Sequence, residues 1–368
     1  MLKHLFGFSL LCLTPLSVFA EEPAPYTWAH ALALESVTNL DGGIAEGTRN
    51  LANLDLTLAI DTHAAGWWEN GNLFMYVLGN YGKAPSDLTG DMQTISNFQT
   101  DNNLKVYEFW YEHSFADGAV KLLAGLHDYN STFYSLESSG LFSTSSFGIG
   151  PDVAQVGPSI FSTTSTAIHL TFSGEHQYFL VATYDGIAGD PYHPHGTHIK
   201  FKKSDGLFNA VEWGVKYEDS YKLALGAWQH TAEVENPVNG NISNANSGLY
   251  LIGEKYFGES VAAFFQYGRA DANKNQLDVY MGVGITLSNA WVDEDVIGLA
   301  YASAHNGSPF LQMNADLLSK ENIWELSYLC PLTSAINAQT SLYVIENPGM
   351  SPDVDNALAL GFRLYIEF

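Results

Sequence analysis

Cysteine and long apolar runs are both scarce in this chain. Among its 368 residues there are only two cysteines, Cys12 and Cys330. Cys12 lies in an N-terminal segment that we expect to be removed, so the mature chain could form no internal disulfide. After that segment, no stretch approaches 18 consecutive apolar residues. The sequence therefore argues against membrane-spanning helices.

Basic residues are also few: 15 Lys and Arg stand against 40 Asp and Glu, for a net charge of −25. A surface of this charge repels nucleic acid, so we expect no nucleic-acid partner. It also argues against a pore for phosphate or other anions, because such pores are lined with Lys and Arg. No ordered catalytic triad or nucleotide-binding turn is present, so we expect neither an enzyme nor a cofactor.

The N-terminal 20 residues have the form of a secretory signal peptide. A short basic start is followed by an apolar stretch, and small or apolar residues at positions 18 and 20 precede a cleavage site before Glu21. The sequence thus predicts export. We expect three segments: a cleaved signal peptide at 1–20, a lead-in at 21–50, and one large domain at 51–368.

Period-two alternation of apolar and polar residues is abundant, whereas helical periodicity is scarce. Leu54, Leu56 and Leu58 share one face of a segment whose other face carries Asn53, Asp55 and Thr57. Similar alternation runs through 107–112, 210–217, 277–287, 323–328 and 357–368. In the segment 107–112, this parity places Tyr107, Phe109 and Tyr111 on the apolar face. The chain is therefore predicted to be all-β.

Two β architectures alternate in this way. A soluble sandwich turns its apolar face inward, whereas a membrane barrel turns it outward to lipid. The segments often run for about 9–12 residues, which suits a tilted strand that crosses hydrocarbon, and sandwich strands are nearer about 5–6 residues. Their polar faces are rich in Gly, Ala and single charges. The sequence predicts a transmembrane antiparallel β-barrel of about 16 strands in the outer membrane at 51–368, preceded by a periplasmic lead-in at 21–50.

The chain ends on a strictly alternating segment whose last residue is Phe368. A terminal aromatic residue on the lipid side resembles the assembly signal of bacterial outer-membrane barrels. We therefore expect Phe368 to engage the barrel-assembly machinery, and the apolar face to contact outer-membrane lipid. The alternative is an ordinary edge strand of a soluble sheet.

The longest segment without strand character is 130–165, which is rich in Ser, Gly and Pro and almost uncharged. Loops of this length are usually functional or disordered. Because it also carries Phe and Ile, we expect it to fold back into the barrel and narrow it. The alternative is an extracellular cap.

Strand parity selects candidates for lining the lumen and contacting a solute. The ten candidates are Glu108, Trp110, Glu112, Glu212, Lys222, Trp228, His230, Glu325, Arg363 and Glu367. Neutral sugars bind by stacking on aromatic rings and by hydrogen bonds to their hydroxyls, so Trp110 and Trp228 are the favoured contacts. The alternative is that these groups only keep the wall hydrated.

Three histidines at 193, 195 and 198 have a spacing seen in metal sites. They lie in a Pro- and Gly-containing segment without a cysteine or a cage of carboxylates. We therefore expect no metal there.

Several stretches match a family pattern in order along the chain. They are "NLANLDLTLAIDT", "GDMQTISNFQT", "KVYEFWYEHSF", "AGLHDYNSTF", "GLFSTSSFGIGPDVAQVGPSIFSTTS", "YDGIAGDPYHPHGTH" and "YVIENPGMSPDVDNALALGFRL". Together they resemble the carbohydrate-selective porins of the OprB type. The resemblance implies a single-chain, 16-stranded barrel in the outer membrane, passive diffusion of sugars, and a long loop that shapes the constriction. Family members often line the pore with arginines, whereas this chain has only Arg49, Arg269 and Arg363.

The leading hypothesis is a passive carbohydrate porin that takes mono- or oligosaccharides as solutes and exists as a monomer or a homotrimer. One alternative is a general or differently selective diffusion porin on the same barrel. Another is a secreted β-rich enzyme or lectin.

Overall fold

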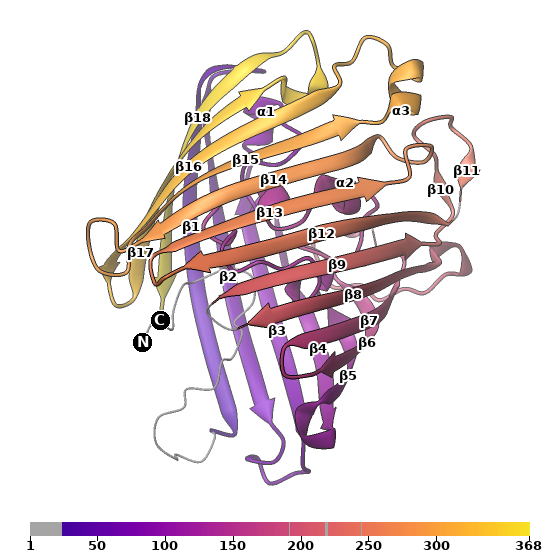
Figure 1. Ribbon diagram of the computed structural model, residues 1–368, viewed down its shortest axis with the longest axis vertical. Coiled ribbons are helices and arrows are strands. Elements are labelled where there is room, and N and C mark those ends of the chain that lie inside the picture. Colours follow the sequence, from indigo (N-terminus) through magenta and orange to yellow (C-terminus); the bar gives the residue numbers. More distant parts are fainter. Residues whose placement is uncertain (1–23, 191, 218–219, 244) are drawn as a thin grey trace.

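The computed structural model describes residues 24–190, 192–217, 220–243 and 245–368. These residues form a closed antiparallel β-barrel of sixteen strands (Figure 1). The predicted fold class and strand number are confirmed. The predicted signal peptide lies outside the described residues.

The barrel strands are β1 (Tyr26–Gly43), β2 (Gly47–Asp61), β3 (Gly71–Gly82), β4 (Asn103–Phe115), β5 (Val120–His127), β6 (Ser165–Ser173), β7 (Gln177–Asp185), β8 (Leu207–Tyr217), β9 (Tyr221–His230), β12 (Asn246–Phe257), β13 (Val261–Ala270), β14 (Leu277–Ser288), β15 (Val296–Asn306), β16 (Lys320–Thr333), β17 (Ile336–Glu346) and β18 (Asp355–Glu367). A separate two-stranded sheet is formed by β10 (Val234–Glu235) and β11 (Ile242–Ser243).

Helical elements in the described residues are short. They are α1 (Ser86–Thr89), α2 (Pro151–Ala154), α3 (Ser308–Met313) and the 3₁₀ turns η1 (Ala116–Gly118), η2 (Tyr129–Ser131), η3 (Ser145–Phe147), η4 (Lys203–Asp205) and η5 (Pro348–Met350). None of the helices among the described residues has the length and apolar character needed to cross a membrane.

Strands that follow one another in the chain are neighbours in the barrel, except that β9 pairs with β12 because β10 and β11 lie in the connection between them. The barrel closes where β1 pairs with β18, and Glu35 there lies directly opposite Arg363. Closure leaves no free sheet edge at this seam, as a membrane requires.

The expected periplasmic lead-in at 21–50 is wrong from Tyr26 onward, because Tyr26–Gly43 forms β1 and β2 begins at Gly47. The outward face of β1 carries His30, Ser36 and Thr38 among its apolar residues, which weakens the alternation. Pairing with both β2 and β18, rather than its own pattern, makes this segment a strand. The segment that begins at 51 is therefore part of the second strand.

The apolar faces of the strands point away from the lumen, as predicted. On β18, Leu360 and Phe362 are exposed on the outside, whereas Arg363 between the outward residues is buried inside. On β8 and β16, Trp213 and Leu326 are likewise exposed on the outside. A band of outward apolar side chains is what surrounding lipid requires.

Tyr107 is an exception, and its predicted lipid-side position is wrong. The pairing of β4 with β3 skips a residue, so Glu108 faces Tyr76 while Val106 faces Val77. This bulge turns both Tyr107 and Glu108 inward, where both are buried. A β-bulge of this kind shifts the alternation by one residue, which period-two reasoning cannot anticipate.

The connections at the two ends of the barrel differ in length. Short turns join β4 to β5, β6 to β7 and β12 to β13 at one end, the end at which β18 finishes. Most of the connections at the other end are long. In outer-membrane barrels the short turns are periplasmic and the long loops extracellular. The loops 83–102 and 128–164 therefore start from the extracellular end, and both fold into the barrel (Figure 1).

Candidate functional site

The β5–β6 loop, 128–164, narrows the lumen, and we call it the constriction loop. Three glutamates hold it to the wall. Glu212 on β8, Glu254 on β12 and Glu325 on β16 each project inward from a different part of the barrel and are buried. Each carboxylate accepts a hydrogen bond from a backbone N–H of the loop. The predicted inward folding of this loop is confirmed.

Glu325 makes the most contacts of the three. Its carboxylate accepts hydrogen bonds from the backbone N–H of Ser143 at 2.8 Å and of Thr144 at 2.9 Å. It also accepts the hydroxyls of Ser143 at 3.0 Å and Thr144 at 2.6 Å. Ser327, on the same face of β16, donates a fifth hydrogen bond at 2.7 Å. A buried carboxylate with these five donors forms a strong anchor, because bonds to a charged group are stronger than neutral ones.

Glu212 holds the start of the loop. Its carboxylate accepts the backbone N–H of Tyr134 at 2.9 Å and the hydroxyls of Tyr178 at 2.7 Å and Tyr250 at 2.6 Å. Glu254 accepts both the N–H and the hydroxyl of Ser138 at 2.8 Å. The two glutamates thus fix the loop against β7, β8 and β12.

Two amides and one lysine of the wall complete the attachment by donating hydrogen bonds to loop carbonyls. Gln266 Nε2 donates to the Phe147 carbonyl at 2.8 Å, and Gln339 Nε2 donates to the Leu141 carbonyl at 2.7 Å. Lys222 Nζ donates to the Ser135 carbonyl at 2.5 Å. The inward polar residues therefore satisfy the backbone of a loop that has no regular partner.

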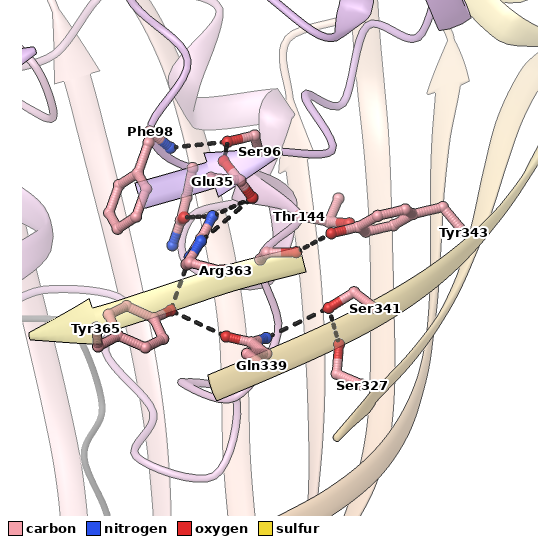
Figure 2. A network of polar contacts seen from close by, with 12 residues as sticks. Glu35, Ser96, Phe98, Thr144, Ser327, Gln339, Ser341, Tyr343, Arg363 and Tyr365 are labelled. Atoms are coloured by element: carbon pink, nitrogen blue, oxygen red, sulfur yellow. Dashed lines mark hydrogen bonds and ion pairs between the residues drawn. The ribbon is translucent and has the colours of Figure 1, made fainter. Parts of the chain in front are cut away.

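The β3–β4 loop, 83–102, is a second inward loop, and it packs on Arg363 (Figure 2). The Arg363 guanidinium donates to Glu35 at 2.8 Å, to the Tyr365 hydroxyl at 2.8 Å and to the Asn97 side chain at 3.0 Å. It also lies over the Phe98 ring, 3.9 Å from the centroid. One buried arginine thus joins the barrel seam to the loop by an ion pair and a cation–π contact.

The two inward loops are also bonded to each other. The Asn97 N–H donates to the Ser143 carbonyl at 2.7 Å, and the Ser145 N–H donates to the Thr94 carbonyl at 2.8 Å. Ser143 therefore links Glu325 to the second loop. The constriction is one hydrogen-bonded unit rather than a single loop.

Asp152 lies in α2, where the constriction loop contacts β13 and β14. Its carboxyl is fully buried and packs on Gly268, where a Cβ would stand 2.3 Å from the carboxyl oxygens. In the described part of the chain, no side chain donates a hydrogen bond to it. Burial raises the pKa of Asp152 to about 7. The carboxyl is therefore neutral in mildly acidic conditions.

All ten predicted lumen residues lie on inward-facing strand positions. Six are buried, with at most 3% of their surface exposed, and contact protein groups: Glu108, Glu212, Trp228, His230, Glu325 and Arg363. Their predicted role in contacting a solute is corrected to loop and wall support, because the inward loops and neighbouring wall residues cover them. His230, for example, bonds the Gly186 carbonyl at 2.6 Å.

The other four candidates, Trp110, Glu112, Lys222 and Glu367, are partly exposed. Glu112 is paired with Lys121 at 3.1 Å, and their side chains are 18% and 40% exposed. Trp110 stacks on Phe74, with the ring centroids 4.9 Å apart. Trp110 and Glu112 lie on β4, whereas Lys222 lies on β9 and Glu367 on β18.

Sequence reasoning missed the second inward loop and several anchors, among them Glu35, Glu254 and Asn97. Glu254 was detectable, because it is a lone acid on the inward parity of β12 beside Tyr250 and Ile252. The role of Asn97 was not detectable, since nothing in a short polar segment indicates that it meets an arginine 266 positions away.

The family model for carbohydrate-selective porins of the OprB family matches residues 45–368. No curated protein matches this chain.

Solved structures share the fold. OprB of Pseudomonas putida in its high-pH structure has a TM-score of 0.81 and 17% identity, and the match covers 94% of each chain. Its low-pH structure has a TM-score of 0.62 and 14% identity, with 94% of this chain and 93% of that chain covered. The outer-membrane channel DcaP of Acinetobacter baumannii has a TM-score of 0.60 and 8% identity, with 95% and 99% covered.

Proposed function

Because this chain belongs to the OprB family of carbohydrate-selective porins, a family of outer-membrane barrels, we propose that sugars diffuse through it along the inner wall of β2–β5. The two inward loops, 83–102 and 128–164, pack on the inner wall of β1 and of the strands from β6 to β18. The inner faces of β2–β5 keep half-exposed side chains, including Thr57, Tyr76 and Trp110. The proposal rests on this difference in side-chain exposure between the wall of β2–β5 and the wall that the loops cover.

The chemistry of this wall suits a neutral, hydroxylated solute. Trp110 offers an indole for the C–H face of a sugar ring. Asp55, bonded to Asn53 at 2.7 Å, and the Glu112–Lys121 pair offer acceptors and donors for hydroxyls. The one ion pair on this part of the wall in the described residues, Glu112–Lys121, presents no net charge to a neutral solute. Such contacts are weak enough to release the sugar, as passage requires, and we assign no catalytic step.

The test is sugar block of ion current through single channels in a planar bilayer, with glucose and maltose. Trp110→Ala should weaken the block while the barrel remains folded, because it removes the stacking surface. Trp213→Ala is the matched control, since Trp213 is a tryptophan on the lipid side. Equal block in Trp110→Ala and the unmodified chain would remove Trp110 from the path.

The alternative function is a general diffusion porin on the same barrel. Liposome swelling with glucose, maltose and neutral amino acids separates the two. Permeation that depends on size alone would refute sugar selectivity.

Assembly partners are part of the proposal. Phe368 is exposed, and its ring meets His30 edge-on at 4.7 Å at the end of the β1–β18 seam. This position leaves it accessible to the barrel-assembly machinery. Deleting Phe368 should lower the amount of folded barrel in outer-membrane fractions, and an unchanged amount would refute that role.

The number of subunits is a separate question. Mass measurement of the intact assembly distinguishes a monomer from a homotrimer.

A further inference from the structure

The outer surface of the barrel carries a groove over β6–β9, on the opposite side of the wall from the proposed sugar path. Its volume is about 400 Å³. Its outward-facing lining consists of Ile168, Leu170, Val181, Thr183, Asn209, Val211, Ala227 and Gln229. The groove lies in the lipid-facing wall, near the extracellular ends of these strands.

Side-chain size explains the groove. Val181, Val211 and Ala227 lie side by side on β7, β8 and β9 in one cross-strand row. The next outward-facing row lies two residues closer to the periplasmic end of the strands. It carries the larger residues Trp213 and Leu225. A row of small side chains beside a row of large ones leaves a trough in an otherwise continuous surface.

The extracellular rim of the groove is polar and uncharged. Thr183, Asn209 and Gln229 form the next cross-strand row, one or two residues from the ends of their strands. The Thr183 hydroxyl donates to Asn209 Oδ1 at 2.8 Å. In the described part of the chain, the Asn209 amide N–H groups and the Gln229 side chain make no hydrogen bond with protein. These neutral groups lie near the extracellular ends of β7, β8 and β9.

A cation lies two strands away from the edge of the groove. Ala227 pairs across the sheet with Leu249 on β12, and Leu249 pairs in turn with Arg269 on β13. Two strand spacings place Arg269 about 10 Å from Ala227. Arg269 is exposed on the outside at the extracellular end of β13, and the described residues include no acidic partner for it. It is one of only three arginines in a chain of charge −25.

We propose that this groove binds an outer-leaflet lipid whose acyl chains are joined by amide bonds to a phosphorylated sugar headgroup, the chemistry of lipid A. An acyl chain fills the apolar trough, which faces hydrocarbon. The amide neck exchanges hydrogen bonds with Asn209 and Gln229, because both sides carry donors and acceptors. The phosphate meets Arg269, whose guanidinium suits phosphate geometry.

The test uses the purified full-length mature barrel in detergent, incubated separately with lipid A, phosphatidylglycerol or phosphatidylethanolamine. Native mass spectrometry counts the lipids retained per chain. We expect one lipid A to be retained in preference to either phospholipid. Ala227→Trp, which fills the trough, and Arg269→Gln should each lower lipid A retention by at least about tenfold, a loss of about 1.4 kcal/mol in binding.

Ala263→Trp is the matched control, because it adds the same side chain at an outward position on β13 outside the groove. It should leave retention unchanged, and heat-modifiable gel migration confirms that each variant is folded. Equal retention of all three lipids, or unchanged retention in Ala227→Trp, would overturn the proposal. A two-chain mass that Ala227→Trp abolishes would instead identify the groove as an interface between copies. Because none of these residues faces the lumen, sugar block tests the proposed function independently.

Discussion

Replacing Glu325 by alanine is the most direct test of how the constriction is built. The change removes the acceptor of two backbone N–H groups and two hydroxyls of the constriction loop, at Ser143 and Thr144. Hydrogen bonds to a charged group contribute about 1.5–3 kcal/mol each, and buried donors left unpaired carry a further cost. Because Glu212 and Glu254 still hold the rest of the loop, we expect a local loss of about 4 kcal/mol rather than complete release.

A loss of about 4 kcal/mol corresponds to about a thousandfold change in the equilibrium between the docked and detached segment. Hydrogen exchange measured by mass spectrometry should therefore show up to about a thousandfold faster exchange at the amides of Ser143 and Thr144. Single-channel conductance should rise, since the loop narrows the lumen.

Leu326→Ala is the control, because Leu326 is the next residue on the same strand and faces lipid. It should change neither exchange in the loop nor conductance. If Glu325→Ala folds normally and leaves both measurements unchanged, the carboxylate does not anchor the loop, and our account of the constriction is refuted.

Three further predictions follow from the wall, the seam and the loop. Leu360→Arg places a charge on the lipid face and should lower the unfolding free energy in lipid vesicles by about 2–4 kcal/mol near the bilayer midplane; a negligible loss would mean that Leu360 faces water. Arg363→Met leaves the Glu35 carboxylate buried without its cation and should cost about 3–5 kcal/mol, part of which Glu35→Gln should restore in the double variant; no recovery would rule out an unpaired charge as the cause. Asp152 has a folded pKa of about 7, above the 3.8 of an ordinary aspartate, so its contribution to loop docking is full below about pH 4 and is lost as pH rises through about 7. Hydrogen exchange at α2, corrected for intrinsic rates, should therefore increase between pH 5 and pH 8 in the natural chain and much less in Asp152→Asn; equal pH dependence in both would refute this.

Parity reasoning could place residues on one side of the wall but could not assign their contacts. Glu325 and Arg363 were correctly placed inside by alternation, because side chains of a strand point alternately to its two faces. Their burial was not predictable, since it depends on Ser143 and Asn97, which the chain brings back from distant positions. A charged side chain on a predicted lumen face can face the water-filled lumen or bind a loop. The apolar–polar alternation of the strand is the same in both cases.

The amino-acid sequence by itself determined which face of each regular strand meets lipid, because a membrane imposes that alternation residue by residue along a single segment. It also determined the approximate strand number and the presence of a long inward loop. Only the tertiary structure decided that Tyr26–Gly43 is a barrel strand, that the bulge turns Tyr107 inward, and that two loops share one constriction. The physical reason is that pairing register and loop docking depend on hydrogen bonds between groups far apart in the chain, and these leave no periodic trace in the sequence.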